Sequence, residues 1–360
     1  MIDLMAYGWD AAFAAAFEER AEAGSVPGRV VRQARDLSTV VTAAGEVPAE
    51  VSGRFRHRAL GPSDFPAVGD WAVVRPVPGG PALVEAVLPR RGAFTRKAAG
   101  EAVEAQVVAA NVDTVLLVSG LDGDFNVRRI ERYLTTAWSS GADPVIVLNK
   151  ADLRPDLEAV NAEAASAAPG VPIVPVRALG EGGLDGLAPF LQAGRTVALL
   201  GSSGVGKSTM INRLLGEERF RTAAMSDAAA GRGRHTTTAR ELVMLPGGAL
   251  LIDTPGMREL GLWADDEGLD RTFDEIEVLA ARCRFPDCGH EREPGCAVRA
   301  AVEAGTLDSR RWESFLKLKR ELRFLELKKD EKTRRQHEKA TGRDFHARLK
   351  EIKRNKLRYR

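Results

Sequence analysis

Short, almost wholly apolar runs alternate with amphipathic segments through the middle of this 360-residue chain. Runs of this kind are typical of strands that are buried on both faces of a parallel sheet. The intervening segments 127–138 and 207–215 place apolar residues at helical spacing. The pattern predicts an α/β domain with a mostly parallel sheet. The expected strands are 112–118, 144–148, 171–176, 196–200 and 249–252.

The N-terminal part has a different pattern. Residues 10–22 read as a short amphipathic helix, and from residue 28 to about 91 brief β-like runs alternate with Gly and Pro turns. This texture predicts a small OB-type β-barrel, a fold that binds oligonucleotides on one face. Residues 54–58, Arg-Phe-Arg-His-Arg, would place cations beside an aromatic ring for RNA contact. The alternative is a core Phe with solvated Arg neighbours.

The net charge of +2 conceals an asymmetry along the chain. Residues 317–360 contain 18 Lys and Arg against 7 Asp and Glu, so the remainder of the chain is acidic. A basic tail on an acidic body suggests a polyanionic partner such as nucleic acid. A solvated helical tail that only aids solubility is the alternative.

Composition and the apolar runs argue against a membrane protein. The hydrophobic content of 44% and charged content of 28% are ordinary for a soluble globular chain. No apolar run approaches the roughly 20 residues of a membrane-spanning helix. The N-terminus lacks the basic segment of a signal peptide, so a cytoplasmic protein that does not bind membranes is expected.

A glycine-rich segment follows the expected strand 196–200 and opens the expected helix 207–215. Its pattern is that of a phosphate loop, in which backbone N–H groups and the helix N-terminus surround nucleotide phosphates. Lys207 would reach the β- and γ-phosphates, and the Ser208 hydroxyl would coordinate Mg²⁺. The residues expected at the phosphates are Gly201, Ser202, Ser203, Gly204, Val205, Gly206, Lys207, Ser208 and Thr209.

A second motif, Asn149-Lys150-Ala151-Asp152, closes the expected strand 144–148. The Asp152 carboxylate can accept from guanine N1–H and the 2-amino group, two donors that adenine does not offer there. Asn149 would tether the loop, and Lys150 would pack along the base. Residues 174–187 occupy the position of a further guanine-contacting loop, in which the Ala178 N–H would meet guanine O6.

The segment Asp253-Thr254-Pro255-Gly256 ends the expected strand 249–252. An Asp at the end of a buried strand after a phosphate loop is the Walker-B position, held near Mg²⁺. The Gly256 N–H would meet the γ-phosphate. Loss of that phosphate would then release this loop.

The stretch 228–238 is small, basic and rich in Thr. One Thr hydroxyl, for which we favour Thr237, would contact Mg²⁺ in the GTP state. Met257 stands where Ras-like GTPases place the Gln that orients the attacking water. His235 is the best candidate to position that water instead, because imidazole can donate or accept at neutral pH. The alternative is that His235 contacts only RNA or solvent.

All three Cys of the chain lie in a C-x4-C-x-H-x5-C pattern made by Cys283, Cys288, His290 and Cys296. Tetrahedral Zn²⁺ takes four nitrogen or sulfur ligands, and three Cys with one His make a closed structural set. Clustered Cys in a cytosolic protein indicate a metal more often than a disulfide. One zinc ion per chain is expected.

The motif order is unusual, because the Asn149–Asp152 tetrad precedes the phosphate loop, whereas small GTPases place it after that loop. In this combination the chain resembles the ribosome small-subunit-dependent GTPase A family (RsgA/YjeQ), whose GTPase domain is circularly permuted. The resemblance covers about residues 25–330. It rests on the tetrad 149–152, on the phosphate loop 201–209 and on three further sets of residues. These are Gly69-Asp70-Trp71, Gly233-Arg234-His235-Thr236-Thr237-Thr238 with Asp253-Thr254-Pro255-Gly256, and the Cys and His cluster.

The resemblance implies an activity and a division of the chain. It implies GTP hydrolysis to GDP, stimulated by the small (30S) ribosomal subunit with its 16S rRNA, in late maturation of that subunit. It also supports His235 in its catalytic role. We expect a monomer. The expected parts are an N-terminal extension (1–24), an OB-type barrel (25–98), a permuted GTPase domain (99–265), a helical zinc domain (266–330) and a basic tail (331–360).

Two other readings of the motifs stay open at this point. GTP could be only a structural ligand of an RNA-binding module, in which case ribosomal subunits would not stimulate turnover. The phosphate loop could belong to an ATP-using kinase or transporter ATPase. Asn149 and Asp152 argue against the second reading, since Asp152 would lose its hydrogen-bond partners with adenine.

Overall fold

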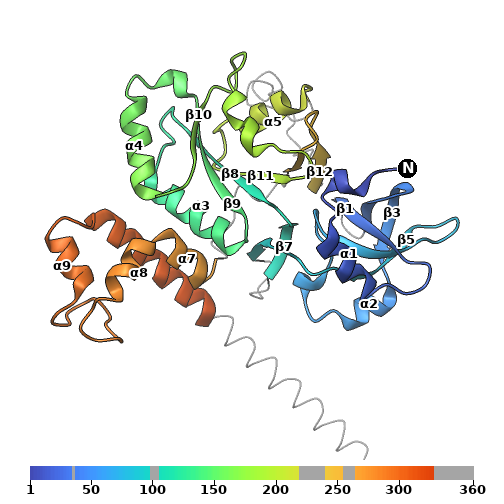
Figure 1. The fold of residues 1–360 in the computed structure, drawn as a ribbon, viewed down its shortest axis with the longest axis horizontal. Helices are drawn as coiled ribbons and strands as arrows, with labels where there is room; N and C mark the ends of the chain where they lie inside the picture. Colours follow the sequence, from blue (N-terminus) through green and yellow to red (C-terminus); the bar gives the residue numbers. More distant parts are fainter. Residues whose placement is uncertain (35–36, 98–104, 219–239, 254–263, 328–360) are drawn as a thin grey trace, which may run out of the picture.

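The computed structural model describes residues 1–34, 37–97, 105–218, 240–253 and 264–327. In Figure 1 a β-barrel lies on one side, an α/β sheet in the middle, and the C-terminal helices on the other side. The observed architecture confirms the predicted fold class, an α/β domain between an OB-type barrel and a helical C-terminal part.

The central sheet has the strand order β10-β9-β8-β11-β13-β12. All neighbours in it pair in parallel except β12, which is antiparallel to β13. Strands β8, β9 and β10 lie on one side of the central strand β11, and all three precede it in the chain. The strands are β8 (Thr114–Gly120), β9 (Asp143–Asn149), β10 (Ile173–Val176), β11 (Thr196–Leu200), β12 (Arg240–Met244) and β13 (Leu250–Asp253).

Helices cover both faces of this sheet. On one face, α3 (Val127–Ser139) and α4 (Leu157–Ala167) bury Ile130, Leu134 and Val160 against the strands. On the other face, α5 (Lys207–Leu215) and the 3₁₀ helix η4 (Asp185–Phe190) pack with Met210 and Leu187. Both faces are apolar, which explains why the strands read as continuous apolar runs. Strand 196–200 and helix 207–215 agree with the sequence prediction residue for residue.

The barrel closes on itself because its first strand pairs with two neighbours. The order is β1-β2-β3-β5-β4, and the additional β1–β4 pairing completes the ring. Short helices lie between β3 and β4, so residues 54–58 belong to a helix, in which Phe55 packs edge-on against Phe65. The elements are β1 (Val26–Ala34), β2 (Leu37–Thr42), β3 (Gly45–Val51), α2 (Gly53–Arg58), η2 (Pro62–Asp64), β4 (Trp71–Arg75) and β5 (Ala82–Val87).

The barrel and the central sheet are continuous. Strand β1 pairs with β12, with Arg32 opposite Glu241, so an 11-stranded sheet runs through both parts. An antiparallel pair, β6 (Ala93–Lys97) and β7 (Ala105–Ala110), follows the barrel in the chain. At the N-terminus, η1 (Leu4–Tyr7) and α1 (Ala11–Glu18) lie against the barrel, where Phe13 packs on Trp71.

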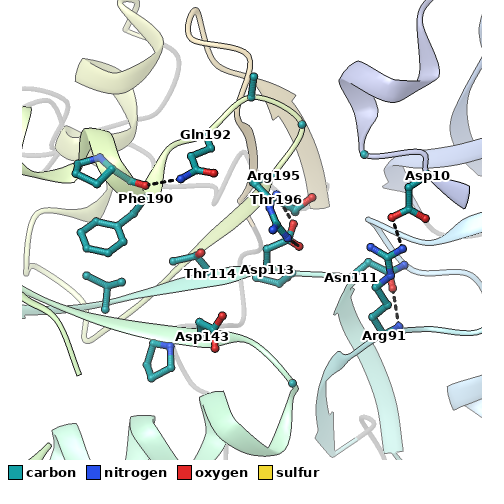
Figure 2. Close-up of a pocket in the computed structure, with 18 of the residues that line it drawn as sticks. Asp10, Arg91, Asn111, Asp113, Thr114, Asp143, Phe190, Gln192, Arg195 and Thr196 are labelled. Carbon is teal, nitrogen blue, oxygen red and sulfur yellow. Dashed lines mark hydrogen bonds and ion pairs between the residues drawn. The ribbon is translucent and has the colours of Figure 1, made fainter. Parts of the chain in front are cut away.

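A cavity of about 950 Å³ lies where the N-terminal segment, the barrel and the central sheet meet (Figure 2). Asp143 and Thr196 line it from the first residues of β9 and β11, and Asp113 lies just before β8. Arg91 faces Asp10 on the barrel side of the cavity (Figure 2). The cavity is therefore at the amino end of the parallel strands, opposite to the end from which the phosphate loop leaves.

The C-terminal part is helical. It contains α7 (Asp266–Thr272), α8 (Asp274–Ala280), α9 (Ala297–Glu303) and a longer helix over residues 309–327, called here the C-terminal helix. These helices enclose a core that includes Phe273 and Phe315. Helix α7 lies beside α3 of the central domain (Figure 1). Among the residues described, no helix is both long and apolar enough to cross a membrane.

Candidate nucleotide site and metal cluster

The predicted nucleotide motifs meet at one edge of the central sheet. Asn149 ends β9, Ala178 follows β10, Gly201 follows β11, and Asp253 ends β13. Because these strands are parallel, their carboxyl ends lie at the same edge. Ligands of open α/β sheets bind in the crevice at that edge. The fold therefore gathers segments that are widely separated along the chain.

Asn149 connects three of these segments. Its Nδ2 donates to the Val205 carbonyl oxygen at 2.8 Å, and its Oδ1 accepts from the Ala178 N–H at 3.2 Å. The side chain is buried, so both bonds are shielded from water. Gly206 has φ +100°, and a Cβ there would lie 2.3 Å from the Asn149 amide nitrogen. Only glycine fits at this position of the loop.

Lys150 reaches from the tetrad to the phosphate loop. Its Nζ donates to the Gly204 carbonyl oxygen at 3.2 Å and forms an ion pair with Asp122. The hydrogen bond from Lys150 lowers the pKa of Asp122. Asp152 lies in the 3₁₀ helix η3 (Ala151–Leu153) with its carboxylate exposed to solvent. Sequence reasoning missed Asp122, which belongs to no motif and is placed here by the loop after β8.

Lys207 lies inside the phosphate loop. Its buried ammonium donates to the Gly201 carbonyl oxygen at 2.6 Å and also to that of Ser202. A Cβ at Gly201 would approach the Val118 carbonyl oxygen to 2.3 Å, so the loop passes directly over β8. Ser203 and Gly204 are exposed, while Ser208 and Thr209 are half-buried in the first turn of α5.

Arg129 contacts the phosphate loop from the other side and was not predicted from the sequence. Its Nη1 donates to the Ser202 hydroxyl at 2.6 Å and pairs with Asp124. Arg129 lies in the first turn of α3, which Asn126 caps by accepting from the Arg129 N–H at 3.1 Å. No motif marks this Arg, because its importance depends on a contact across 73 residues of sequence.

Several predicted residues lie outside the part of the chain that the structure describes. They include the Thr and His of the stretch 228–238 and the residues that follow Asp253. Their expected roles stay predictions. The residues concerned are His235, Thr237 and Gly256.

The four predicted metal ligands come together in the C-terminal part. Their ligand atoms all lie within 4.8 Å of one another. The Cys283 and Cys296 sulfurs are 3.9 Å apart, and the His290 Nδ1 lies 3.5 Å and 3.4 Å from them. A tetrahedral site with Zn–S near 2.3 Å and Zn–N near 2.0 Å has ligand–ligand edges of roughly 3.5–3.8 Å. The donor set and its spacing fit zinc.

The surroundings of the cluster hold the ligands in place. The Arg299 N–H donates to the Cys296 sulfur at 3.4 Å, so Cys296 also caps α9. His290 adopts φ +60°, which turns the chain sharply between Cys288 and Cys296. Its ring packs edge-on against Trp312 of the C-terminal helix, with centroids 5.9 Å apart. The cluster thus joins an irregular loop to the helical core.

Comparison with known proteins agrees with this geometry. The family model described as RsgA GTPase matches residues 87–263. The small ribosomal subunit biogenesis GTPase RsgA of Opitutus terrae is 54% identical over 328 residues, covering 88% of this chain and 89% of the relative. The chain belongs to the RsgA GTPase family. The Streptomyces coelicolor RsgA is 47% identical, covering 92% of this chain and 90% of the relative.

Solved structures show the same architecture. YjeQ from Thermotoga maritima matches with a TM-score of 0.62 at 28% identity, covering 83% of this chain and 98% of that one. YloQ, described as a circularly permuted GTPase, has a TM-score of 0.61 at 23% identity, covering 83% and 95%. The chain therefore has the predicted permuted fold. Family membership makes it a GTP hydrolase that acts on guanine nucleotide.

Proposed function

We propose that this RsgA GTPase binds the small ribosomal subunit and hydrolyses GTP to GDP and phosphate during late maturation of that subunit. The observation that carries the proposal is the Asn149 contact, which joins the tetrad to the phosphate loop at Val205 and to Ala178. The subunit as partner is supported by the names of relatives, small ribosomal subunit biogenesis GTPases, at 54% and 47% identity.

The base-reading end of the pocket follows from the tetrad. The exposed Asp152 carboxylate accepts from the N1–H and 2-amino group of guanine, and the Lys150 stem lies along the base. The Ala178 N–H already donates to Asn149 at 3.2 Å, so guanine O6 would have to share this donor. Because adenine offers no donors to Asp152, the site favours GTP over ATP.

The phosphate end follows from the loop. Backbone N–H groups from Gly201 to Ser208 and the N-terminus of α5 surround the phosphates. Lys207 exchanges its two carbonyl contacts for phosphate oxygens. Mg²⁺, when bound, neutralises charge on the β- and γ-phosphates. Ser208, Asp253 and Thr237 are the residues that would hold it.

His235 is proposed to position the attacking water, since Met257 has no group that can do so. The test is single-turnover and steady-state GTP hydrolysis with and without 30S subunits, with 50S and 70S particles as controls. The His235→Ala variant should lose most stimulated turnover while keeping GTP affinity and subunit binding. Stimulated turnover that persists in the variant would remove the catalytic role, and loss of subunit binding would make His235 a docking residue.

On the small subunit, the protein is proposed to contact rRNA. The tail 331–360, which is rich in Lys and Arg, is proposed to contact the RNA backbone, and the protein to act as a cytoplasmic monomer. Deleting the tail should weaken subunit binding and flatten its salt dependence, because fewer counterions are released on binding. An unchanged salt slope would show that the tail is a solvated appendage. GTP binding in the absence of subunits should be unaffected.

Two competing readings have clear signatures in the same assay. If GTP is only a structural ligand, turnover stays at the basal rate with every ribosomal particle. If the protein uses ATP, then ATP competes with GTP at similar concentrations. Whichever reading holds, we propose that one zinc ion per chain stabilises the C-terminal helices. Its ligands would be Cys283, Cys288, His290 and Cys296.

A further inference from the structure

One turn of helix α3 contacts two different parts of the molecule. Arg129 faces the phosphate loop, where it donates to the Ser202 hydroxyl at 2.6 Å. Its neighbours Arg128, Glu131 and Arg132 instead make ion pairs with the C-terminal helix. Successive helical residues point in different directions around the axis, so a single turn can bridge the two parts.

The contact on the loop side holds Ser202 at two points. Its side-chain hydroxyl accepts from Arg129, and its main-chain carbonyl accepts from Lys207. Arg129 is itself held by the ion pair with Asp124. Ser202 thus lies between Lys207, which a bound phosphate would attract, and Arg129, which belongs to α3.

The contact on the other side is largely buried. Glu131 is 1% exposed and accepts from Arg311 Nη1 at 3.1 Å and from the Ser314 hydroxyl. Arg311 also pairs with Glu275. Nearer the surface, Arg132 Nη2 lies 2.9 Å from both carboxylate oxygens of Glu321. A displacement of α3 relative to the C-terminal helix would break these bonds, so the contacts oppose such a displacement.

We propose that Arg129 is a positioning residue for the phosphate loop, and that the turn 128–132 couples nucleotide binding to the position of the C-terminal helix. The inference rests on the proposed function, namely that this loop binds guanine nucleotide. When phosphate draws Lys207 away from the Ser202 carbonyl, the Arg129 contact decides where Ser202 and α3 settle. Coupling of this kind is reciprocal, so a changed C-terminal contact must alter nucleotide binding.

The loop contact is tested by dissociation of a fluorescent GDP analogue from the full-length protein. Arg129→Ala and Ser202→Ala should each speed dissociation about 3–10-fold, which is the effect expected for losing one ordinary, partly exposed hydrogen bond. The double variant should be no faster than either single one, because both remove the same contact. Arg129→Lys should recover part of the effect, and thermal unfolding midpoints should stay close to that of the wild type.

The coupling is tested by a second cycle. Introduced into the otherwise wild-type protein, Glu321→Gln should speed GDP dissociation about twofold. Introduced into the Arg129→Ala variant, it should cause no further change. Arg310→Ala, which removes an exposed pair with Asp308 at the start of the C-terminal helix, is the control and should change nothing. If the wild type binds GDP normally, two results would overturn this inference alone. One is that Glu321→Gln leaves GDP dissociation unchanged, and the other is that its effect simply adds to that of Arg129→Ala. A wild type that binds no GDP would overturn the proposed function as well.

Discussion

Arg29 of the barrel donates a hydrogen bond from Nη2 to the Thr196 hydroxyl at 2.8 Å. Thr196 is the first residue of β11, the strand that ends at the phosphate loop. The same guanidinium donates to the Tyr7 carbonyl oxygen and, from Nε at 3.3 Å, to that of Gly69. Burial lowers the pKa of Arg29 to about 10, so the group remains a cation at neutral pH. One buried side chain thus joins the N-terminal segment, the barrel and the central sheet.

Arg29→Met is expected to lower the free energy of unfolding by roughly 3 kcal/mol, because the buried guanidinium makes three hydrogen bonds that Met cannot replace. Denaturant unfolding measures the change. Arg75→Met is the matched control, since Arg75 forms a half-exposed barrel pair with Glu85 and should cost about 0.5 kcal/mol or less. Equal effects of the two substitutions would show that Arg29 does not join the parts.

Asp10 gives the N-terminal segment a dependence on pH. The hydrogen bond from Arg91 lowers the pKa of Asp10 below its ordinary value of 3.8. The stabilisation by Asp10 is therefore complete above the unfolded pKa and is lost as the pH falls through the lower folded pKa. The ring centroids of Trp9 and Trp71 are 4.6 Å apart, so Trp fluorescence reports whether the N-terminal segment lies against the barrel.

Asp10→Asn is the comparison for this titration. Asn retains an oxygen that can cap α1, as Asp10 does by accepting from the Ala12 N–H at 3.0 Å, but it cannot titrate. The wild type should show a fluorescence transition below pH 3.8 that the variant lacks. Superimposable titrations of the two proteins would contradict the assigned role.

Asp152→Asn should change the preferred base. The amide can donate to the 2-oxygen of xanthine but cannot accept from both guanine donors, so GTP affinity should fall at least about tenfold and xanthine nucleotide affinity should rise. Competition binding measures both. Asp156→Asn, an exposed carboxylate that pairs with Arg154 nearby, should leave the preference unchanged. A wild type in which ATP and GTP compete equally would refute the assignment.

Cys288→Ala should remove the metal. Freshly prepared reduced wild type is expected to carry about one zinc ion per chain, since four ligands make one closed site. Loss of one ligand should also loosen residues 275–316, because metal binding contributes to local folding. Metal analysis and hydrogen exchange test the two effects. Asp287→Ala, a change at the exposed neighbour, is the control and should retain both metal and protection.

Much of the site could be predicted because its motifs are local in the chain. The phosphate loop from Gly201 to Ser208, the tetrad beginning at Asn149 and the cluster from Cys283 to Cys296 each need only a few consecutive residues at a set spacing. Flanking strands and helices were also readable, since burial on both faces leaves continuous apolar runs. These features determined the nucleotide class, the reversed motif order and the fold class from the sequence alone.

The tertiary structure decided which distant side chains support those motifs. Arg129 on Ser202 and Asp122 on Lys150 bridge 73 and 28 residues of sequence, and Arg29 reaches Thr196 across 167. The continuation of the barrel into the central sheet through β1 and β12 likewise depends on an encounter of distant strands. An Arg or Asp outside a motif has the same sequence signature whether it is solvated or paired. Only packing determines which of them meets a partner, because packing sets the distances on which hydrogen bonds depend.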